Sequence, residues 1–376
     1  MPPSRLSPTI VAAPNEVKVL WSAFAEESIA GAAQSPAWYF CWQASVNSDC
    51  LVAALCNEKR PVLLLPLEIE RKGGLRIASY VGGPHANCNF PALAPGQSVT
   101  RADLVNLFKA LHTARPDIDL VTLARQLGEL ADTANPIIQL SSRQNPNVSL
   151  AIRLDVEFDT LLGRHNPKRK IKKHKYVARR FSDAGGYRIV TASSASETEA
   201  MLDKYFAWKA DRLARAGIRN TYEPKGVMPF FHRLFAEEAA SPSPAFELRA
   251  LEVANEYRAV LGKSHARDRT FIDFVGIADD ELTSISPGEF LFYEDIEKSC
   301  GTDLAIYSFG IGDEPYKRSW SDLESPTFDT DFGLTARGQI YGIYLGARRT
   351  LVRRIKQSPK VWSFVKAART RLRGHR

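Results

Sequence analysis

The chain has 376 residues, of which 44% are hydrophobic and 24% charged, a composition that excludes a disordered, collagen-like or coiled-coil protein. A single core rarely grows beyond about 250–300 residues, so this length predicts about two domains. The 50 Lys and Arg residues outnumber the 42 Asp and Glu residues and give a net charge of +8. The five cysteines include no CxxC pair, so we expect no metal site, no disulfide framework and a reducing compartment.

The sequence also bears on location. No apolar run reaches the roughly 18 residues that a membrane-spanning helix needs. The Pro-rich start has no charged segment followed by an apolar one, so a signal peptide is not expected. These features predict a cytoplasmic protein.

Strand and helix patterns alternate over the first 160 residues. Residues 51–55 and 62–67 read as two strands joined by a turn, and residues 79–84 as a strand that runs into a Gly-Pro turn. An amphipathic helix is predicted over 102–113 and a strand over 118–123. The first half is therefore expected to be α/β.

The second half begins the pattern again. Its longest predicted helix covers residues 196–216, with Ser196 as the N-cap and Glu199 at capping-box spacing. Together the two halves predict an α/β (α+β) protein with mixed, mostly antiparallel sheets flanked by helices. The other predicted elements are strands at 187–191, 246–253, 257–265, 269–276 and 306–309, and helices at 228–240 and 287–299.

The positive charge is concentrated in two stretches. Arg164–Arg180 contains nine basic residues and Arg337–Arg376 twelve, and neither stretch contains an acidic residue. The remainder has 29 basic against 42 acidic residues, which is an acidic body. These shifts predict domains at 1–163 and 181–336, a basic connector helix at 164–180 and a basic tail at 337–376.

Each basic stretch has two interpretations. The connector is either a solvated linker helix or a phosphate-binding surface, and its single aromatic residue, Tyr176, disfavours sequence-specific recognition of nucleic acid. The tail after Pro359 has the spacing of an amphipathic basic helix. It either packs on the body or docks on an anionic membrane surface.

Two motifs in the second half have the residue types of a binding site. Ser286-Pro287-Gly288-Glu289 opens a predicted helix, whose first N–H groups either bind a phosphate or simply start the helix. Residues 307–317, YSFGIGDEPYK, form a strand that ends in a glycine-rich turn with two carboxylates. Asp273 lies within an apolar strand, where burial is expected to raise the pKa of its carboxyl unless the side chain points to solvent.

With these motifs the sequence resembles the GNAT-fold acyltransferases of the bacterial polysaccharide-associated type, the acetyltransferases of the cellulose-biosynthesis kind. That family is similar in layout to the Fem-type peptidoglycan aminoacyltransferases. The chain lacks the Q/R-x-x-G-x-G/A loop that binds pyrophosphate across the GNAT superfamily, and Ser286-Pro287-Gly288 occupies its place. The matching motifs are Pro66-Leu67, Gly82-Gly83-Pro84-His85, Asn89-Phe90-Pro91, the basic helix Lys168–Arg180, Trp208-Lys209 through Arg212, and Phe309-Gly310 through Lys317.

The resemblance implies tandem GNAT-like domains and an acyl-CoA-dependent N- or O-acyltransferase. It implies acetyl-CoA or another acyl-CoA as donor, no metal, and a small-molecule or saccharide acceptor linked to polysaccharide synthesis. Two alternatives stay open: an aminoacyltransferase that uses charged tRNA, and a non-catalytic module of a polysaccharide-synthesis complex.

Acyl transfer needs a base for the acceptor, stabilisation of the oxyanion and a proton for the leaving thiolate. The candidate catalytic residues are Asp313, Glu314 and Asp273 as carboxylates and Tyr307 as acid. The candidate donor-binding residues are Ser286, Pro287, Gly288, Glu289 and Lys317, and the candidate acceptor-binding residues are His85, Trp208 and Tyr316.

Overall fold

The computed structural model describes residues 6–24 and 28–357. The chain divides into two compact units: unit 1 contains residues up to Tyr39, Asn47–Val148 and the chain from Ser325, and unit 2 contains Phe40–Val46 and Ser149–Glu324. These borders differ from the expected ones at residues 163 and 336. The reason is strand pairing, because residues 149–153 join the sheet of unit 2 and residues 327–333 join the sheet of unit 1.

Unit 1 is a mixed sheet with the strand order β1-β2-β3-β4-β6-β15, in which β4 and β6 are parallel. Helix α10 packs on one face of β4 and β6, where Tyr341 and Leu345 contact the buried Leu75, Ile77 and Leu120. The elements are β1 (Ser7–Val11), α1 (Pro14–Ser22), β2 (Cys50–Asn57), β3 (Arg60–Lys72), β4 (Leu75–Tyr80), β5 (Ala92–Leu93), α3 (Arg101–Ala114), β6 (Leu120–Leu127), β7 (Glu129–Leu130), β8 (Thr133–Ala134), β15 (Leu323–Gly333) and α10 (Ala336–Gln357).

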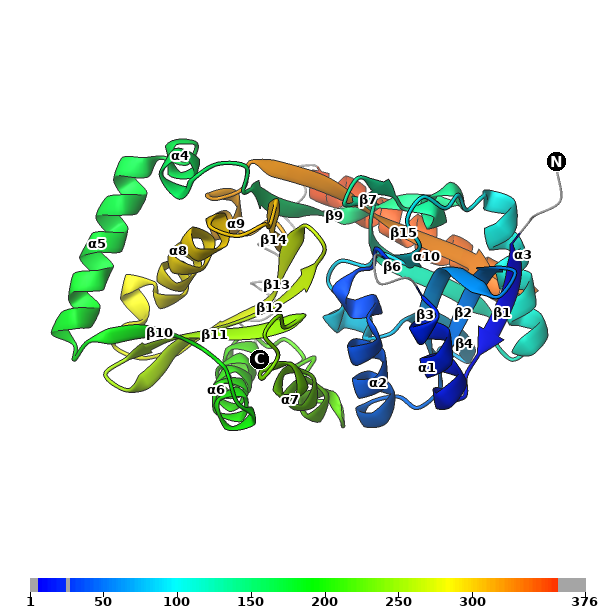
Figure 1. Ribbon diagram of the computed structural model, residues 1–376, viewed down its shortest axis with the longest axis horizontal. Coiled ribbons are helices and arrows are strands. Elements are labelled where there is room, and N and C mark those ends of the chain that lie inside the picture. Colours follow the sequence, from blue (N-terminus) through cyan, green and yellow to red (C-terminus); the bar gives the residue numbers. More distant parts are fainter. Residues whose placement is uncertain (1–5, 25–27, 358–376) are drawn as a thin grey trace. The chain divides into compact units, whose positions relative to one another are not determined.

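Unit 2 has the strand order β9-β14-β13-β12-β11-β10, in which β13 and β14 are parallel. Figure 1 shows α6 and α7 on one face of β11–β13 and α8 on the other. The elements are α2 (Pro36–Ser45), β9 (Ser142–Arg153), α4 (Phe158–Gly163), α5 (Pro167–Asp183), β10 (Tyr187–Thr191), α6 (Ala195–Arg215), α7 (Val227–Glu238), β11 (Phe246–Val253), β12 (Glu256–Ala266), β13 (Arg269–Ile277), α8 (Pro287–Cys300), β14 (Ile306–Ile311) and α9 (Pro315–Arg318). Strands β9 and β15 and helix α2 contribute residues to both units.

The two units repeat one order of elements. In unit 1 the antiparallel strands β2, β3 and β4 lead through α3 to β6, which is parallel to β4. In unit 2 the antiparallel strands β11, β12 and β13 lead through α8 to β14, which is parallel to β13. The expected mixed α/β architecture is confirmed.

The start of α6 corrects the expected N-cap. Ser194, not Ser196, caps the helix, because its side chain accepts the N–H of Glu197. The carboxylate of Glu197 in turn accepts the N–H and the hydroxyl of Ser193 at 2.8 Å. Two overlapping serine–glutamate pairs have capping-box spacing here, and the sequence alone does not distinguish them.

The basic connector is helix α5, and it does not lie free in solvent on all sides. Val177 and Phe181 are buried, and Ile171 packs against the core of unit 2. His174 stacks on Phe290 and Tyr293 of α8, with ring centroids 4.6 and 3.9 Å apart. These residues, three to four positions apart, form a stripe along one face of α5 that packs on unit 2. The interpretation as a solvated linker is wrong for that face.

The remaining basic stretch is only partly described. Helix α10 covers residues 336–357, and the tail sequence after Pro359 lies outside the described residues. Among the helices that the structure describes, none is long and apolar enough to cross a bilayer.

Candidate active site

The candidate site begins where two parallel strands of unit 2 separate. β13 and β14 are paired only between Arg269–Phe271 and Ile306–Ser308. Beyond Ser308, β14 turns through Gly310, whose φ of 68° lies in the left-handed region that favours glycine. The C-terminal half of β13 thus continues without β14 beside it.

A β-bulge places Asp273 on this free half of β13. Ile272 pairs with Lys263 and Phe274 pairs with Gly262, so Asp273 is the extra residue of the bulged strand. Phe274 stacks on Tyr205 of α6 with a centroid distance of 4.3 Å, whereas Ile272 belongs to the core on the α8 side. A bulge turns consecutive side chains to one face, and Asp273 therefore faces α6 together with Phe274.

Burial changes the acidity of this carboxyl. Asp273 is partly exposed as a residue, but its Oδ2 atom is buried. Burial raises the pKa of Asp273 to about 7, against an opposing effect of a hydrogen bond with Ser264. A carboxyl with a pKa near neutrality has the acidity of a general base that works at physiological pH.

Two tyrosines that the sequence did not single out adjoin Asp273. The hydroxyl of Tyr205 on α6 donates to the hydroxyl of Tyr222 at 2.7 Å. Burial is the main cause of the raised pKa of both phenols, and the charge of Asp273 raises them further. The pKa of Tyr222 rises to about 12, so Tyr222 is a protonated hydroxyl at neutral pH. Only the proximity created by folding identifies this pair, because Tyr222 lies in a loop without a recognisable motif.

Helix α6 approaches β13 very closely at Gly276. A Cβ atom at this position would lie 2.6 Å from Cδ2 of Tyr205 and 3.4 Å from Cε3 of Trp208. Glycine is therefore required for the approach, and it brings the predicted acceptor-binding residue Trp208 onto the free half of β13.

The turn after β14 reaches the same helix. Lys209 of α6 has a lowered pKa, caused mainly by burial and opposed by the charge of Glu314. Burial raises the pKa of Tyr316, Glu314 adds to the shift and Arg212 opposes it. The charge of Glu314 thus reaches Lys209 on α6, whereas the ring of Tyr316 stacks on Phe292 of α8, with ring centroids 5.4 Å apart, and packs against the core on the α8 side.

Three predicted residues of this turn have structural partners. The exposed Asp313 forms an ion pair with Arg318. Lys317 is buried, and its Nζ lies 3.0 Å from Oε2 of Glu314 and donates to the carbonyl of Ile311 at 2.9 Å. In the structure Lys317 therefore pairs with Glu314, because the turn into the short helix α9 places residues three apart on one side.

Tyr307 lies on the opposite face of the sheet from Asp273. It is fully buried among the residues on the α8 side, and its hydroxyl donates to Oδ2 of Asp295 at 2.8 Å. Asp295 also binds Arg249 and, at 3.0 Å, Lys263. The fold therefore puts Tyr307 in a buried charge cluster and does not bring it to the bulge.

The Ser286 turn is more closed than the sequence indicated. Pro287 has no N–H, and the N–H groups of Glu289 and Phe290 both point to the carbonyl of Ser286, at 3.1 and 3.2 Å. Gly288 is buried, and a Cβ atom there would lie 2.9 Å from Cγ2 of Ile277, so this glycine allows α8 to pack on β13.

Positive charge reaches the Ser286 turn from α5. Lys173 forms an ion pair with Glu289 and donates to Oγ of Ser286 at 3.4 Å. Lys170 lies 3.5 Å above the ring of Trp320, and burial lowers its pKa to about 8. These residues line a small pocket of about 50 Å³ that also borders α8. The structure thus brings the basic connector and the Ser286 motif together.

His85 is part of unit 1. It is buried in a short 3₁₀ turn that follows Gly82, and its N–H donates to the carbonyl of Gly82 at 2.9 Å. Gly82 has a φ of 104°, so the glycine of this motif is required by its left-handed turn. In the described residues, no group of three or more His, Cys, Asp or Glu residues has the arrangement of a metal site.

Comparison with known proteins agrees with this architecture. The family described as acetyltransferase (GNAT) domain matches residues 168–318, which include the bulge and the Ser286 turn. No curated protein matches the sequence.

Several solved structures are similar to this chain at low sequence identity. L-PGS from Bacillus licheniformis has a TM-score of 0.49 and 10% identity over 86% of this chain and 98% of its own. A protein of unknown function from Bacteroides thetaiotaomicron has a TM-score of 0.55 and 12% identity over 84% and 96% of the two chains. FemX has a TM-score of 0.53 and 10% identity over 82% and 93% of the two chains. The last two likenesses show a shared fold over most of the chain, and the family match indicates that residues 168–318 are GNAT-like.

Proposed function

We propose that the protein is an acyl-CoA-dependent acyltransferase that transfers an acyl group, with acetyl as the first candidate, to an amine or hydroxyl of its acceptor. The observation that carries the proposal is Asp273, a carboxyl with a pKa of about 7 at a bulge beside the separation of β13 and β14. This position lies inside the region that matches the acetyltransferase (GNAT) family.

The chemistry assigned to the site has three parts. The carboxylate of Asp273 takes the proton of the acceptor nucleophile as it attacks the thioester carbon. A backbone N–H of the free half of β13 stabilises the oxyanion that forms. The C–S bond then breaks, and the leaving thiolate receives a proton from the hydroxyl of Tyr222, which stays protonated at neutral pH.

We assign the acceptor to the α6 side of β13. Trp208 supplies an apolar ring surface there, and Lys209 of α6 and Glu314 of the turn after β14 add charged groups. Such a mixture suits a small polar molecule or a saccharide, since sugars pack on aromatic rings and hydrogen-bond at their edges. The role in polysaccharide synthesis is part of this proposal.

We assign the donor's phosphates to the Ser286 turn, with a different set of contacts from the one expected. The backbone N–H groups of Glu289 and Phe290 are already bonded, so the charge must come from Lys170 and Lys173 of α5. Both ammonium groups border the same pocket, and a phosphate there would compete with Glu289 for Lys173.

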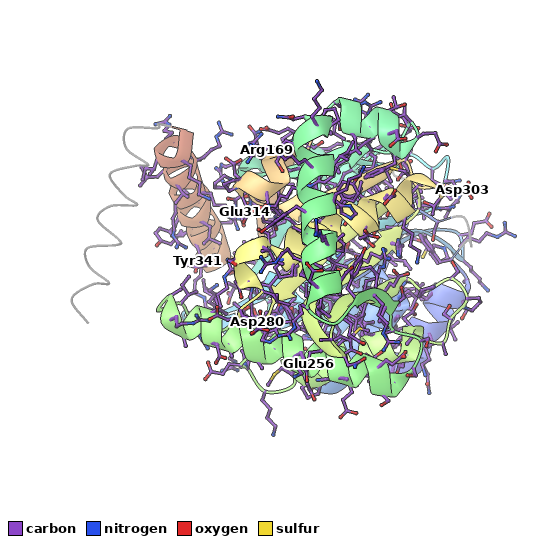
Figure 2. All side chains as sticks on the ribbon, turned by 90° about the vertical axis from the view of Figure 1, so that its left-hand side faces the viewer. Arg169, Glu256, Asp280, Asp303, Glu314 and Tyr341 are labelled. Atoms are coloured by element: carbon purple, nitrogen blue, oxygen red, sulfur yellow. The ribbon has the colours of Figure 1, made fainter. Side chains whose placement is uncertain are left out.

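One observation favours a second candidate, transfer from aminoacyl-tRNA. Helix α5 has seven exposed cations and no acid before Asp183: Lys168, Arg169, Lys172, Lys173, Lys175, Arg179 and Arg180. Figure 2 shows side chains projecting from this helix, with Arg169 near its N-terminal end. A cluster of cations along a helix is the electrostatic footprint of a polyanion site.

Calorimetry with acetyl-CoA and longer acyl-CoAs tests the proposal, with charged and uncharged tRNA as further titrants. We expect micromolar binding of an acyl-CoA and about tenfold weaker binding in Lys170→Gln and Lys173→Gln. Lys168→Gln, at an exposed position away from the pocket, serves as the matched control. Tight tRNA binding without acyl-CoA binding would favour the aminoacyltransferase, and no binding of either would leave a non-catalytic module.

A peripheral association with anionic membranes is also proposed. Helix α10 exposes Ile340, Ile343, Tyr344 and Leu351, with 56–71% of each residue accessible, at a spacing that places them along one helix face. Co-sedimentation with phosphatidylglycerol vesicles at low and high salt tests it. Unchanged binding after Ile343→Ser and after removal of residues 358–376 would show the proposal to be wrong.

A further inference from the structure

Unit 1 contains a pocket of about 500 Å³ that the proposed acyl transfer does not use. The pocket lies where β4 and β6 separate, because their pairing is confined to Ile77–Ser79 and Leu120–Thr122. Residues just beyond this point, Tyr80 and Arg125, form part of its wall, and α10 forms another part. The volume is within the usual ~300–1,000 Å³ of small-molecule sites.

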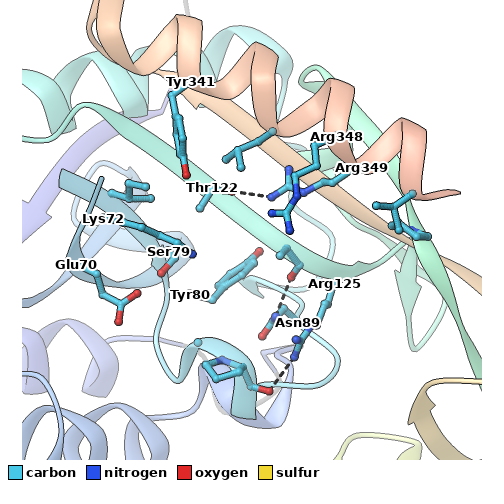
Figure 3. Close-up of a pocket in the computed structure, with 17 residues that line it drawn as sticks. Glu70, Lys72, Ser79, Tyr80, Asn89, Thr122, Arg125, Tyr341, Arg348 and Arg349 are labelled. Atoms are coloured by element: carbon cyan, nitrogen blue, oxygen red, sulfur yellow. Dashed lines mark hydrogen bonds between the residues drawn. The ribbon is translucent and has the colours of Figure 1, made fainter. Parts of the chain in front are cut away.

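The charged groups in the wall are mostly cations. Lys72, Arg125, Arg348 and Arg349 line the pocket, and Glu70 is the single acid among the lining residues. Figure 3 shows Lys72 extending from β3 and the two neighbouring arginines reaching in from α10 on another side. Cations from separate elements thus converge on one space.

Two of these cations are held in fixed positions. Arg349 pairs with Asp331, lies 3.3 Å from Oδ2 of Asp329, and donates to Oγ1 of Thr122 at 3.2 Å. Arg125 has a φ of 56° at a bulge of β6 and donates to the carbonyl of Pro84 at 2.8 Å. A non-glycine residue in this conformation carries backbone strain, and such strain is concentrated at functional sites.

The other two cations are uncommitted. Among the residues that the structure describes, the side chains of Lys72 and Arg348 have neither an ion pair nor a hydrogen bond. The half-buried guanidinium of Arg125 donates to carbonyl oxygens rather than to a carboxylate, and its partial burial lowers its pKa. An anion in the pocket would therefore meet unneutralised positive charge.

The rest of the wall is suited to a larger molecule than an inorganic ion. Ile77, Tyr341, Leu345 and Val352 offer an apolar surface beside the cations, and Ser79 offers a hydroxyl. A ligand with an anionic end and a ring or chain body matches this division. A phosphate has three terminal oxygens and up to two negative charges, so it can bind cations from separate elements at once, which a single carboxylate with two oxygens and one charge does less well.

We propose that the unit 1 pocket is a second binding site, for a small molecule that carries a phosphate or diphosphate, which Lys72 and Arg348 bind while Arg125 and Arg349 shape the site. This site does not depend on the acyl transfer proposed for unit 2. The same chemistry is found in soluble phosphate esters and in phospholipid head groups, and the test includes both.

The test is calorimetry of the full chain with uridine 5′-diphosphate, glucose 1-phosphate and dihexanoyl phosphatidic acid. Uridine and glucose serve as uncharged controls, and glucuronate as the carboxylate control. We expect at least one phosphate probe to bind and the controls to bind at least tenfold more weakly. A preference for the soluble esters or for the lipid identifies the source of the phosphate.

Three substitutions assign the binding to this pocket. Lys72→Gln and Arg348→Gln are expected to weaken the phosphate probe about tenfold each, whereas Glu70→Gln is expected to tighten it about two- to fivefold by removing repulsion. Arg354→Gln, on an exposed position of α10 outside the pocket, should change affinity less than about twofold. A tighter affinity of Glu70→Gln for the phosphate probe cannot arise from unfolding. Circular dichroism checks that Lys72→Gln and Arg348→Gln are folded, so that their weaker affinities come from the lost side chains.

The proposal is overturned if no phosphate probe binds, if glucuronate binds equally well, or if Arg354→Gln weakens binding as much as Arg348→Gln. It is also overturned if Arg348→Gln weakens acetyl-CoA to the same extent as the phosphate probe, because the pocket would then be the carrier's own site. Absence of acetyl-CoA binding with retained phosphate binding would instead refute only the proposed acyl transfer.

Discussion

The hydroxyl of Tyr205 donates to that of Tyr222 at 2.7 Å, and both phenols lie close enough to Asp273 for its charge to raise their pKa values. The carboxyl and the two hydroxyls come from β13, α6 and the loop before α7, elements that are up to 68 residues apart. Their proximity puts a proton acceptor and a proton donor next to each other on one face of the sheet.

The first prediction concerns the pH dependence of catalysis. Since a base must be deprotonated and the pKa of Asp273 is about 7, the wild-type rate is expected to rise with pH through about 7. Asp273→Asn should remove this rise and lower kcat by about 10²–10⁴-fold, the usual contribution of a general base. Steady-state assays between pH 5.5 and 9 with acetyl-CoA provide the measurement.

Asp279→Asn is the control for that experiment, because Asp279 is exposed shortly after β13 and pairs with Arg215. It should keep both kcat and the pH profile. A pH profile that persists in Asp273→Asn would assign the base to another group, with Glu314 as the next candidate.

The second prediction concerns stability and uses the same residue. Burial raises the pKa of Asp273 from 3.8 to about 7, so between these values the folded chain holds a proton that the unfolded chain has lost. Folding stability therefore falls as pH rises from about 4 to 7 and then levels off. Asp273→Asn, which cannot ionise, should gain over wild type across this window by up to about 4 kcal/mol.

Thermal unfolding at pH 5 and pH 8 measures this effect. The stability advantage of the variant over wild type should be clearly larger at pH 8 than at pH 5, where only about a third of it has developed. If wild type and Asp273→Asn have equal melting temperatures at pH 5 and again at pH 8, the carboxyl ionises in the folded protein without a cost in stability.

The third prediction concerns the buried charge cluster on the other face of the sheet. Burial alone would raise the pKa of Asp295, but Lys263 and Arg249 outweigh it, and the pKa of Asp295 is lowered. Asp295→Asn leaves these two cations buried without their shared carboxylate. Loss of one member of such a cluster costs about 3–5 kcal/mol, and Glu247, 2.9 Å from Lys263, should keep the loss near the lower value.

Urea unfolding, together with hydrogen exchange of the α8 amides, measures this loss. Glu256→Gln is the matched control, because its 3.4 Å pair with Lys204 is exposed and should contribute less than about 0.5 kcal/mol. A similar loss of unfolding free energy in Asp295→Asn and Glu256→Gln would show that burial does not make the Asp295 cluster more important than an exposed ion pair.

Much of the fold could be predicted because local patterns agree with the final structure. The strands over 187–191 and 246–253 have the predicted bounds, and the helix over 287–299 extends by one residue. Alternating apolar residues and turn residues fix these elements locally. The two capping boxes before α6 show the limit, since only the folded chain chooses Ser194.

The candidate site was predicted less completely. Asp273 stood out because a charge within an apolar strand is unusual, and Trp208 lies against the same strand at Gly276, whereas the ring of Tyr316 stacks on Phe292 of α8. Tyr222 has no sequence signal, and Tyr307 faces the other side of the sheet because strand alternation determines the direction of its side chain. The packing role of Gly288 against Ile277 depends on contacts between elements, which no local motif encodes.

By itself the sequence determined the mixed α/β architecture, the basic helix and the identity of the unusual carboxyl, because these follow from composition and from periodicity over short segments. Only the tertiary structure decided which groups adjoin Asp273, that α5 brings lysines to the Ser286 turn, and that four cations surround a pocket in unit 1. The physical reason is that register, bulges and helix packing set these distances, and they form between residues that are far apart in the chain.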